Sequence, residues 1–350
     1  MKNVLFIDYI PITSKDQING GGQIRRYYAW NAVNSIASTV ISFRKRKGGI
    51  NWRNIISILN EDHVIWVEYR CGGIAHLFAL LLSLNRSKKL ILNIHDLSTQ
   101  QRDFDKNAWI VKRIRLSIVE KLLLERADVI ILAWPKLLDY FKPNTDQKIQ
   151  IMPPGVGEDE FFISTPAKAN VKKTAIYFGS MRRKGFIPKI IELFSGLNDW
   201  ELQLIGPKEG ENIFEKNNVK YMGSVSHNKL MDIVSKADVI LIPLPRNEYT
   251  DKFVPIKIGY VLKTCKPVIV TKLRGISEFI SMCGLDDNVI YLNEWNADTL
   301  KEALHKAESI NIDINKTFER LKPLAWEPRF KKAVNIAFDD IEYSDQIIWL

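Results

Sequence analysis

A helix-length segment leads directly into a β-branched run in the sequence Pro255-Ile256-Lys257-Ile258-Gly259-Tyr260-Val261-Leu262-Lys263-Thr264-Cys265-Lys266-Pro267-Val268-Ile269-Val270. The run at residues 267–270 is short and apolar, which predicts a strand. Runs of this kind recur along the chain and alternate with helix-length amphipathic segments, for example residues 23–35, 75–84 and 108–126. Strands that alternate with helices imply βαβ units and parallel sheets.

The predicted strands fall into two series, which a polar, Lys-rich stretch at residues 164–173 separates. The first series is 4–7, 40–43, 63–68, 90–94, 129–132 and 149–152, and the second is 174–178, 201–205, 220–222, 239–243, 267–270 and 289–292. Two such series predict an α/β protein with two Rossmann-like domains. Neither contains G-x-G-x-x-G, so a nicotinamide dinucleotide is disfavoured. Ligands of such proteins bind at the carboxyl ends of strands, where loops of both domains face a cleft.

The composition is that of a folded globular protein: 350 residues, 46% hydrophobic and 26% charged. Three scattered cysteines, Cys71, Cys265 and Cys283, favour a reducing compartment, and no Cys or His spacing suggests a metal. The first apolar run is too short for a signal peptide, and residues 72–84 fall short of the roughly 20 needed for a membrane span. We therefore expect a cytoplasmic protein.

The formal net charge is +10, and most of the excess lies in residues 1–160. A basic surface can meet nucleic acid, an anionic membrane or a phosphorylated substrate. No nucleic-acid motif accompanies the charge, so nucleic acid is not expected as a partner.

Three loops that follow predicted strands carry candidate chemistry. Residues 19–28 are a glycine run that leads into a helix, an arrangement that lets backbone approach a ligand and offers N–H groups to an anion. His95-Asp96 follows the fourth strand, and a neutral imidazole can donate or accept a hydrogen bond there. Asp96 can orient that ring or cap the loop. Arg182-Arg183-Lys184 forms a glycine-flanked basic cluster after the first strand of the second series, where fixed cations can stabilise an anion.

These stretches resemble, in order, the motifs of family 4-like retaining glycosyltransferases (glycosyltransferase group 1). Residues 255–270 resemble P-x-K-x-x-E-Y-x-x-x-G-K-P-V-I, residues 19–28 G-G-x-x-R, residues 93–97 the H-D motif, residues 151–162 I-P-N-G-V-D, and residues 175–185 G-R/S-x-x-x-K-G. Weaker matches follow at 219–230, 237–243 and Leu324-Ala325-Trp326-Glu327. The resemblance covers nearly the whole chain and implies the GT-B fold, two Rossmann-like domains facing a nucleotide-sugar cleft.

The resemblance also implies domain limits and site residues. The domains are residues 1–163 on the acceptor side, residues 164–326 for the nucleotide sugar, and a C-terminal helix in 327–350 that returns to the first domain. His95 and Asp96 are the implied catalytic residues, with His95 reaching the donor sugar. The implied donor-binding residues are Gly21, Gly22, Arg25, Gly155, Gly179, Arg182, Arg183, Lys184, Glu248, Asp251, Lys257 and Tyr260.

The chain departs from the family at the donor clamp. The family's E-x7-E acids fall on Lys252 and Tyr260, and the family's glycine falls on Cys265. Glu248 or Asp251 can replace the first acid if the loop is shifted. A Tyr at 260 offers the ribose one phenolic O–H in place of a carboxylate.

The implied activity is transfer of a sugar from a UDP- or GDP-sugar to a glycan, lipid-linked or other acceptor. It proceeds with retention and without an obligatory metal or further cofactor, and the leaving phosphate helps to deprotonate the acceptor on the same face. Two alternatives stay open: a degenerate, non-catalytic binder of a nucleotide or partner, suggested by the missing acids, and a nucleotide-sugar 2-epimerase. The sequence does not name the sugar, base, acceptor or oligomeric state.

Cations lie beside apolar residues in the first domain, at Arg44-Lys45-Arg46-Lys47 with Trp52 and at Trp109-Ile110-Val111-Lys112-Arg113-Ile114-Arg115-Leu116. Such surfaces can lie on anionic lipid. One hypothesis is therefore a peripheral enzyme on the inner face of the membrane with a lipid-linked acceptor. The other is an ordinary core-packed helix with a solvated face.

Overall fold

The computed structural model describes residues 3–7, 14, 15, 18, 21–37, 39–43, 63–69, 74–85, 87–95, 110–140, 143–157, 172–179, 181, 186–207, 218–338 and 347–349. The chain forms two compact units. Unit 1 comprises Met1–Ser14, Gly22–Pro153 and Trp326–Leu350, and unit 2 comprises Lys15–Gly21 and Pro154–Ala325. The expected boundary at 163/164 lies outside the described residues.

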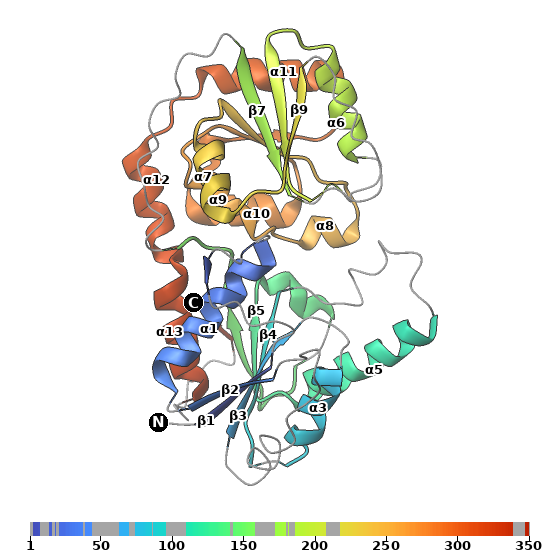
Figure 1. Ribbon diagram of the computed structural model, residues 1–350, viewed down its shortest axis with the longest axis vertical. Helices are drawn as coiled ribbons and strands as arrows, with labels where there is room; N and C mark the ends of the chain where they lie inside the picture. Colours follow the sequence, from blue (N-terminus) through green and yellow to red (C-terminus); the bar gives the residue numbers. More distant parts are fainter. Residues whose placement is uncertain are drawn as a thin grey trace. The chain divides into compact units, whose positions relative to one another are not determined.

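Unit 1 is built on a parallel sheet whose strands lie in the order β13-β6-β5-β4-β3-β1-β2 (Figure 1). The strands are β1 Asn3–Ile7, β2 Thr39–Phe43, β3 His63–Tyr69, β4 Leu90–Ile94, β5 Val129–Leu132, β6 Lys148–Ile151 and β13 Ile347–Trp349. The helices are α1 Gly21–Ile36, α3 Ile74–Ser83, α5 Ile110–Arg126, the 3-10 helix η3 Pro135–Tyr140, and α13 Trp326–Phe338. β13 was not among the predicted strands; it pairs with β6 at the edge of the sheet.

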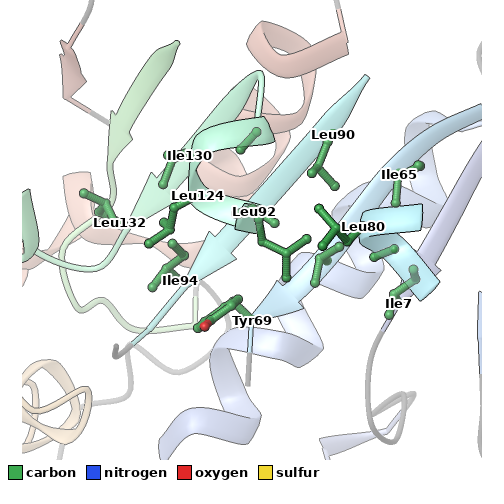
Figure 2. Close-up of a cluster of buried hydrophobic side chains, with 14 of the residues drawn as sticks. Ile7, Ile65, Tyr69, Leu80, Leu90, Leu92, Ile94, Leu124, Ile130 and Leu132 are labelled. Atoms are coloured by element: carbon green, nitrogen blue, oxygen red, sulfur yellow. The ribbon is translucent and has the colours of Figure 1, made fainter. Parts of the chain in front are cut away.

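Alternate residues of these strands point to opposite faces of the sheet, and the two faces differ in chemistry. One face packs against α3 and α5 in an aliphatic cluster that includes Ile7, Ile65, Leu92 and Ile130 (Figure 2). The opposite face is aromatic. There, the ring of Phe6 stacks on Trp66 and meets Trp30 of α1 edge to face, with centroids 6.3 and 5.1 Å apart.

Unit 2 contains a second parallel sheet, in the order β12-β11-β10-β7-β8-β9 (Figure 1). Its strands are β7 Lys173–Phe178, β8 Trp200–Ile205, β9 Val219–Gly223, β10 Val239–Ile242, β11 Val268–Thr271 and β12 Val289–Leu292. Its helices are α6 Phe186–Ser195, α7 His227–Ser235, α8 Glu248–Lys252, α9 Lys257–Leu262, α10 Arg274–Cys283, η5 Asp286–Asn288, α11 Ala297–Ser309, α12 Ile314–Leu321 and η6 Lys322–Leu324. The two parallel sheets confirm the predicted α/β class.

The two ends of the main segment of unit 2 meet. Val156 forms a parallel β-bridge with Ala325, and its N–H donates to the carbonyl of Leu324 at 3.3 Å. α13 begins directly afterwards and belongs to unit 1. Within that unit, Arg329 Nη1 donates to the carbonyl of Pro153 at 2.8 Å, and Gln150 Nε2 donates to that of Ala333 at 3.4 Å.

Candidate active site

A chain of buried polar side chains ends at His95 in unit 1. Glu68 stands directly opposite Asn93 in the register of β3 and β4, on the aromatic face of the sheet. Asn93 Nδ2 donates to Glu68 Oε1 and Oε2 at 2.9 and 3.0 Å, and Trp66 Nε1 donates to Oε1 at 2.8 Å. His95 follows β4, and its Nε2 lies 3.2 Å from Glu68 Oε2. The carboxylate therefore sets the orientation of the imidazole.

The Glu68 carboxyl group is shielded from solvent. The residue is 1% exposed, and its burial raises the pKa of the carboxyl from 4.5 to about 6. Hydrogen bonds from Asn93 and Trp66, and the charges of Arg26 and Arg25, oppose that shift. The His95 side chain is 11% exposed, so the pair has a buried acid and a ring that reaches the surface.

Arg25 lies behind this pair. It comes from α1, is fully buried, and its Nε and Nη2 donate to Asn93 Oδ1 at 3.3 and 3.0 Å. Its Nη1 donates to the carbonyl of Met152 at 2.7 Å, and its guanidinium carbon lies 5.7 Å from the Trp326 ring centroid. These contacts fix Asn93 and join α1 to β4 and α13. Arg25 is thus placed to position the network, and its expected contact with a donor stays a prediction.

Sequence reasoning missed Glu68 and Asn93. The available signal was a polar residue within each of two apolar strand runs, His63–Tyr69 and Leu90–Ile94. Strand alternation puts Glu68 on the same face as Trp66, but only the register of β3 against β4 brings Glu68 and Asn93 together.

In unit 2, Lys257 reaches the carboxyl end of β7. It is the first residue of α9, and its Nζ donates to the carbonyl of Phe178 at 2.8 Å. The ammonium also lies over the rings of Tyr177 and Phe178, 4.6 and 5.3 Å from their centroids. A cation is therefore held at the point where β7 ends.

Glycines line the same edge of the sheet. Gly179 follows β7 with φ +140°, and Gly206 follows β8 with φ +143°. A Cβ on Gly206 would lie 2.0 Å from the carbonyl oxygen of Gly179, so a side chain cannot be placed there. A Cβ on Gly179 would lie 3.4 Å from Lys257 Nζ. The glycine backbone at the end of β7 therefore lies beside the ammonium group of Lys257.

The residue at the family's ribose position is enclosed by side chains. Tyr260 is 3% exposed, its ring meets that of His227 edge to face at 5.2 Å, and Lys263 Nζ lies 5.3 Å from its centroid. One residue earlier, a Cβ on Gly259 would lie 2.8 Å from the carbonyl oxygen of Gly155. Gly155 therefore runs close against α9 within unit 2.

Glu248 and Asp251, the two candidates to replace the first acid of the family's E-x7-E pair, differ in their surroundings. Asp251 Oδ1 accepts a hydrogen bond from the N–H of Arg274 at 3.0 Å, at the start of α10, and its Oδ2 lies 3.7 Å from Arg274 Nε. The Glu248 side chain is 83% exposed and lies 3.5 Å from Lys252 Nζ. Asp251 is engaged in holding α10, so Glu248 is the better placed of the two to turn toward a ligand.

Other expected site residues are only partly visible. Asp96, Arg182, Arg183 and Lys184 lie outside the described residues. Gly21 and Gly22 are the first residues of α1. Within the described part of the chain, no group of three His, Cys, Asp or Glu residues is arranged to hold a metal, and no helix is long and apolar enough to cross a membrane.

Residues 172–308 match the family model described as Glycosyl transferases group 1. No curated protein matches the chain by sequence. Among solved structures, the chain is similar to a sucrose-phosphate synthase from Thermosynechococcus elongatus, with a TM-score of 0.68 and 13% identity over 96% of this chain and 98% of that chain.

It is also similar to a UDP-forming α,α-trehalose-phosphate synthase from Burkholderia xenovorans in complex with glucose-6-phosphate, with a TM-score of 0.61 and 10% identity over 97% and 100% of the two chains. A third match is a trehalose-6-phosphate synthase studied for glycosyl transfer with retention, with a TM-score of 0.61 and 10% identity over 95% and 98%. At these identities the likeness shows the fold alone, and it confirms the GT-B fold expected from the sequence.

Proposed function

We propose that this chain, in which residues 172–308 match the glycosyl transferases group 1 model within a GT-B fold, is a glycosyltransferase that transfers a sugar from a UDP- or GDP-sugar with retention. The acceptor is a saccharide, which includes a sugar phosphate or a lipid-linked sugar. The similar structures support this choice, because they include a UDP-forming synthase in complex with glucose-6-phosphate and a synthase studied for glycosyl transfer with retention. Donor, acceptor and stereochemistry are proposals for this chain.

The observation that carries the proposal is Lys257 at the glycine-lined end of β7. Its charge is held by the Phe178 carbonyl and two aromatic rings, beside backbone that has no Cβ to block a ligand. A diphosphate gains negative charge as it leaves, and a cation fixed before the reaction stabilises that charge without reorganisation. We therefore assign Lys257 to the donor diphosphate.

His95 has the complementary role in this proposal. Glu68 orients the imidazole, and we assign this ring to a hydrogen bond with a sugar hydroxyl or with the oxygen that departs. Without a second acid at a convincing spacing, retention fits transfer on the same face, where the leaving phosphate takes the acceptor proton.

The first experiment measures nucleotide binding by thermal shift and calorimetry with UDP, GDP, ADP and dTDP. Lys257→Met keeps an apolar stem over the two rings but removes the charge, and we expect its affinity to fall roughly tenfold to a hundredfold. The matched control is Lys263→Met, a lysine over a ring just beyond the other end of α9. Equal affinities of Lys257→Met and the wild type for every nucleotide would overturn the assignment.

Two alternatives rest on particular observations. The enclosed Tyr260, which lacks a carboxylate for the ribose, favours a binder without transfer, and that protein would bind a nucleotide but consume no donor. The Glu68–His95 pair supplies the acid and histidine that a 2-epimerase needs. Deuterium incorporation at C2 of a nucleotide sugar, followed by NMR, separates epimerisation from transfer, and the anomeric coupling of the transfer product tests retention.

A further inference from the structure

The last two residues of β3 extend past one of the two strands beside it. Among the described residues, the ladder between β3 and β1 ends at Val67, which stands opposite Ile7. On the other side, β3 stays paired with β4 as far as Tyr69. In the part of the chain that the structure describes, Glu68 and Tyr69 therefore have a neighbouring strand on one side only.

The side chain of Tyr69 is fixed from α5. It is buried at the end of the aliphatic cluster, beside Ile94 (Figure 2). Its phenolic hydroxyl donates to Glu120 Oε2 at 2.6 Å, and Glu120 is buried as well. This hydrogen bond ties the last residue of β3 to the helix that packs on the aliphatic face of the sheet.

The backbone of Glu68 is fixed from α3. His76, in the first turn of that helix, is buried, and its ring hydrogen-bonds to the Glu68 backbone. Burial lowers the pKa of His76 from 6.5 to about 4, so the ring is neutral at physiological pH. The bond to Glu68 opposes this shift, which identifies the imidazole as the donor. The ring also meets that of Tyr69 edge to face, with centroids 5.6 Å apart.

The end of β3 is thus held from both faces of the sheet. On the aromatic face, the Glu68 carboxylate accepts from Trp66 and Asn93 and lies 3.2 Å from His95 Nε2. On the aliphatic face, His76 holds the backbone of the same residue. The contact with His95 leaves little room for displacement, because a hydrogen bond is lost beyond about 3.5 Å.

We propose that His76 and Glu120 are positioning residues for Glu68, which keep its carboxylate within reach of His95 by fixing the end of β3. Apolar side chains at both places would give a more stable core, so two buried polar groups there indicate a constraint other than stability. The effect on turnover rests on the role proposed for His95 in sugar transfer. The placement of Glu68 does not.

The test compares variants of His76 that keep its shape with variants that keep its donor. His76→Phe preserves an aromatic ring against Tyr69 but removes the N–H. His76→Asn and His76→Gln return an amide N–H at the place of one or the other ring nitrogen. The matched control is Gln147→Met, since Gln147 is buried and its Nε2 donates to two backbone carbonyls at 2.6 and 2.8 Å, before β6 at the opposite edge of the same sheet.

The first measurement is an NMR titration of the Glu68 carboxyl carbon, which needs no substrate and is assigned with Glu68→Gln. The charged groups that face this carboxyl, Arg25, Arg26 and His95, are the same in every variant. Burial is the main reason why its pKa is about 6. We therefore expect His76→Phe to admit water and move this pKa toward 4.5, and the better amide variant to restore it.

The second measurement is steady-state turnover. His76→Phe should lower kcat roughly threefold to tenfold and leave the KM for the donor unchanged, because the nucleotide is assigned to unit 2. An unchanged or higher Glu68 pKa in His76→Phe, or the same fall in Gln147→Met, overturns the proposal.

Tyr69→Phe provides the second variant if His76→Phe does not fold. It removes the bond to Glu120 and should move the Glu68 pKa in the same direction, and an unchanged pKa in Tyr69→Phe would equally overturn the proposal. A wild type that neither binds a nucleotide nor consumes a donor refutes the proposed function only, because the titration still decides the positioning role. Normal turnover together with an unchanged titration refutes the positioning role only.

Discussion

At the scale of single residues, the unusual feature is an acid buried on the aromatic face of a sheet. A buried carboxylate is costly unless hydrogen bonds compensate it, and Glu68 has donors from Trp66, Asn93 and His95. Such networks tend to mark functional sites, because a hydrophobic residue would give a more stable core. Glu68 is therefore interpreted as a positioning residue for His95.

Glu68→Gln should separate activity from stability. The amide oxygen can accept from Trp66 and Asn93, but the amide nitrogen would face His95 Nε2 and force the other tautomer of the ring. We expect turnover to fall at least about tenfold while nucleotide affinity, which we assign to unit 2, is unchanged. Steady-state kinetics and calorimetry check this, with Glu125→Gln, an exposed glutamate of unit 1, as the control. Unaltered turnover in Glu68→Gln would remove the positioning role.

The pH dependence of the wild type follows from the same residue. The folded pKa of Glu68, about 6, is above the ordinary value of 4.5, so the fold favours the neutral acid. Its contribution to the free energy of unfolding therefore rises as the pH falls from about 6 to 4.5, by at most about 2 kcal/mol. Turnover should fall over that range as the carboxylate is lost. Denaturant midpoints across this range should show a gain that Glu68→Gln lacks.

At the scale of elements, α9 begins at Lys257, which we assign to the donor diphosphate, and is followed by a residue with strained backbone. Lys257 begins the helix, and Cys265 follows it in the left-handed region, with φ 51°. The N–H of Cys265 donates to the carbonyl of Leu262 at 3.1 Å, which holds the turn before β11. Burial raises the pKa of the Cys265 thiol to about 11, so the side chain acts as a small neutral group. The left-handed backbone at residue 265 explains why the family that this chain resembles has glycine at this position.

Cys265→Gly should stabilise unit 2. Glycine removes the steric cost of a Cβ in the left-handed region, about 1–2 kcal/mol. Part of this gain is offset, because glycine also gives the unfolded chain more conformational entropy. We expect a net gain of about 0.5–1 kcal/mol in the free energy of unfolding, measured by denaturant titration. Cys265→Ala keeps the Cβ and provides the control, because it should show no gain. A less stable glycine variant would mean that contacts of the thiol outweigh the backbone term.

At the scale of the whole molecule, unit 1 is built from both ends of the chain. Trp326 and Phe330 of α13 are fully buried, and both lie against the Arg25 guanidinium, 5.7 and 5.6 Å from it. Arg329 donates a hydrogen bond to the carbonyl of Pro153, and the carbonyl of Ala333 accepts one from Gln150. Unit 2, in contrast, closes on itself through the bridge between Val156 and Ala325.

Truncation after Ala325 should therefore unfold unit 1 and spare unit 2. The loss of two buried aromatic side chains alone removes about 3–5 kcal/mol each, which is comparable to the stability of a whole domain. Limited proteolysis should digest residues before Pro153 and leave a resistant fragment that begins near Pro154 and still binds nucleotide. The full-length chain is the reference. Survival of a folded unit 1 in the truncated chain would contradict this dependence.

Much of the architecture could be read from the sequence, because strands and helices are local patterns. The apolar runs at 4–7, 90–94 and 129–132 lie in strands, the run at 267–270 is shifted by one residue from β11, and the alternation of such runs with helices indicated the parallel sheets. β13 at Ile347–Trp349 escaped because a three-residue strand at a sheet edge has too short a pattern to distinguish from a turn. His95 was expected as a site residue because it follows a strand, where α/β proteins bind ligands, and Lys257 because of the family motif; both roles stay predictions.

The sequence by itself determined the fold class and the positions where a ligand is expected, since both follow from periodicity and from glycines and charges after strands. Only the tertiary structure decided which side chains contact each other. Glu68 meets Asn93 through strand register, Arg25 turns inward because α1 packs on that face, and Asp251 holds α10. These contacts join residues that are 23 to 127 positions apart in the sequence. No local pattern specifies them, because they form only when the strands and helices pack together.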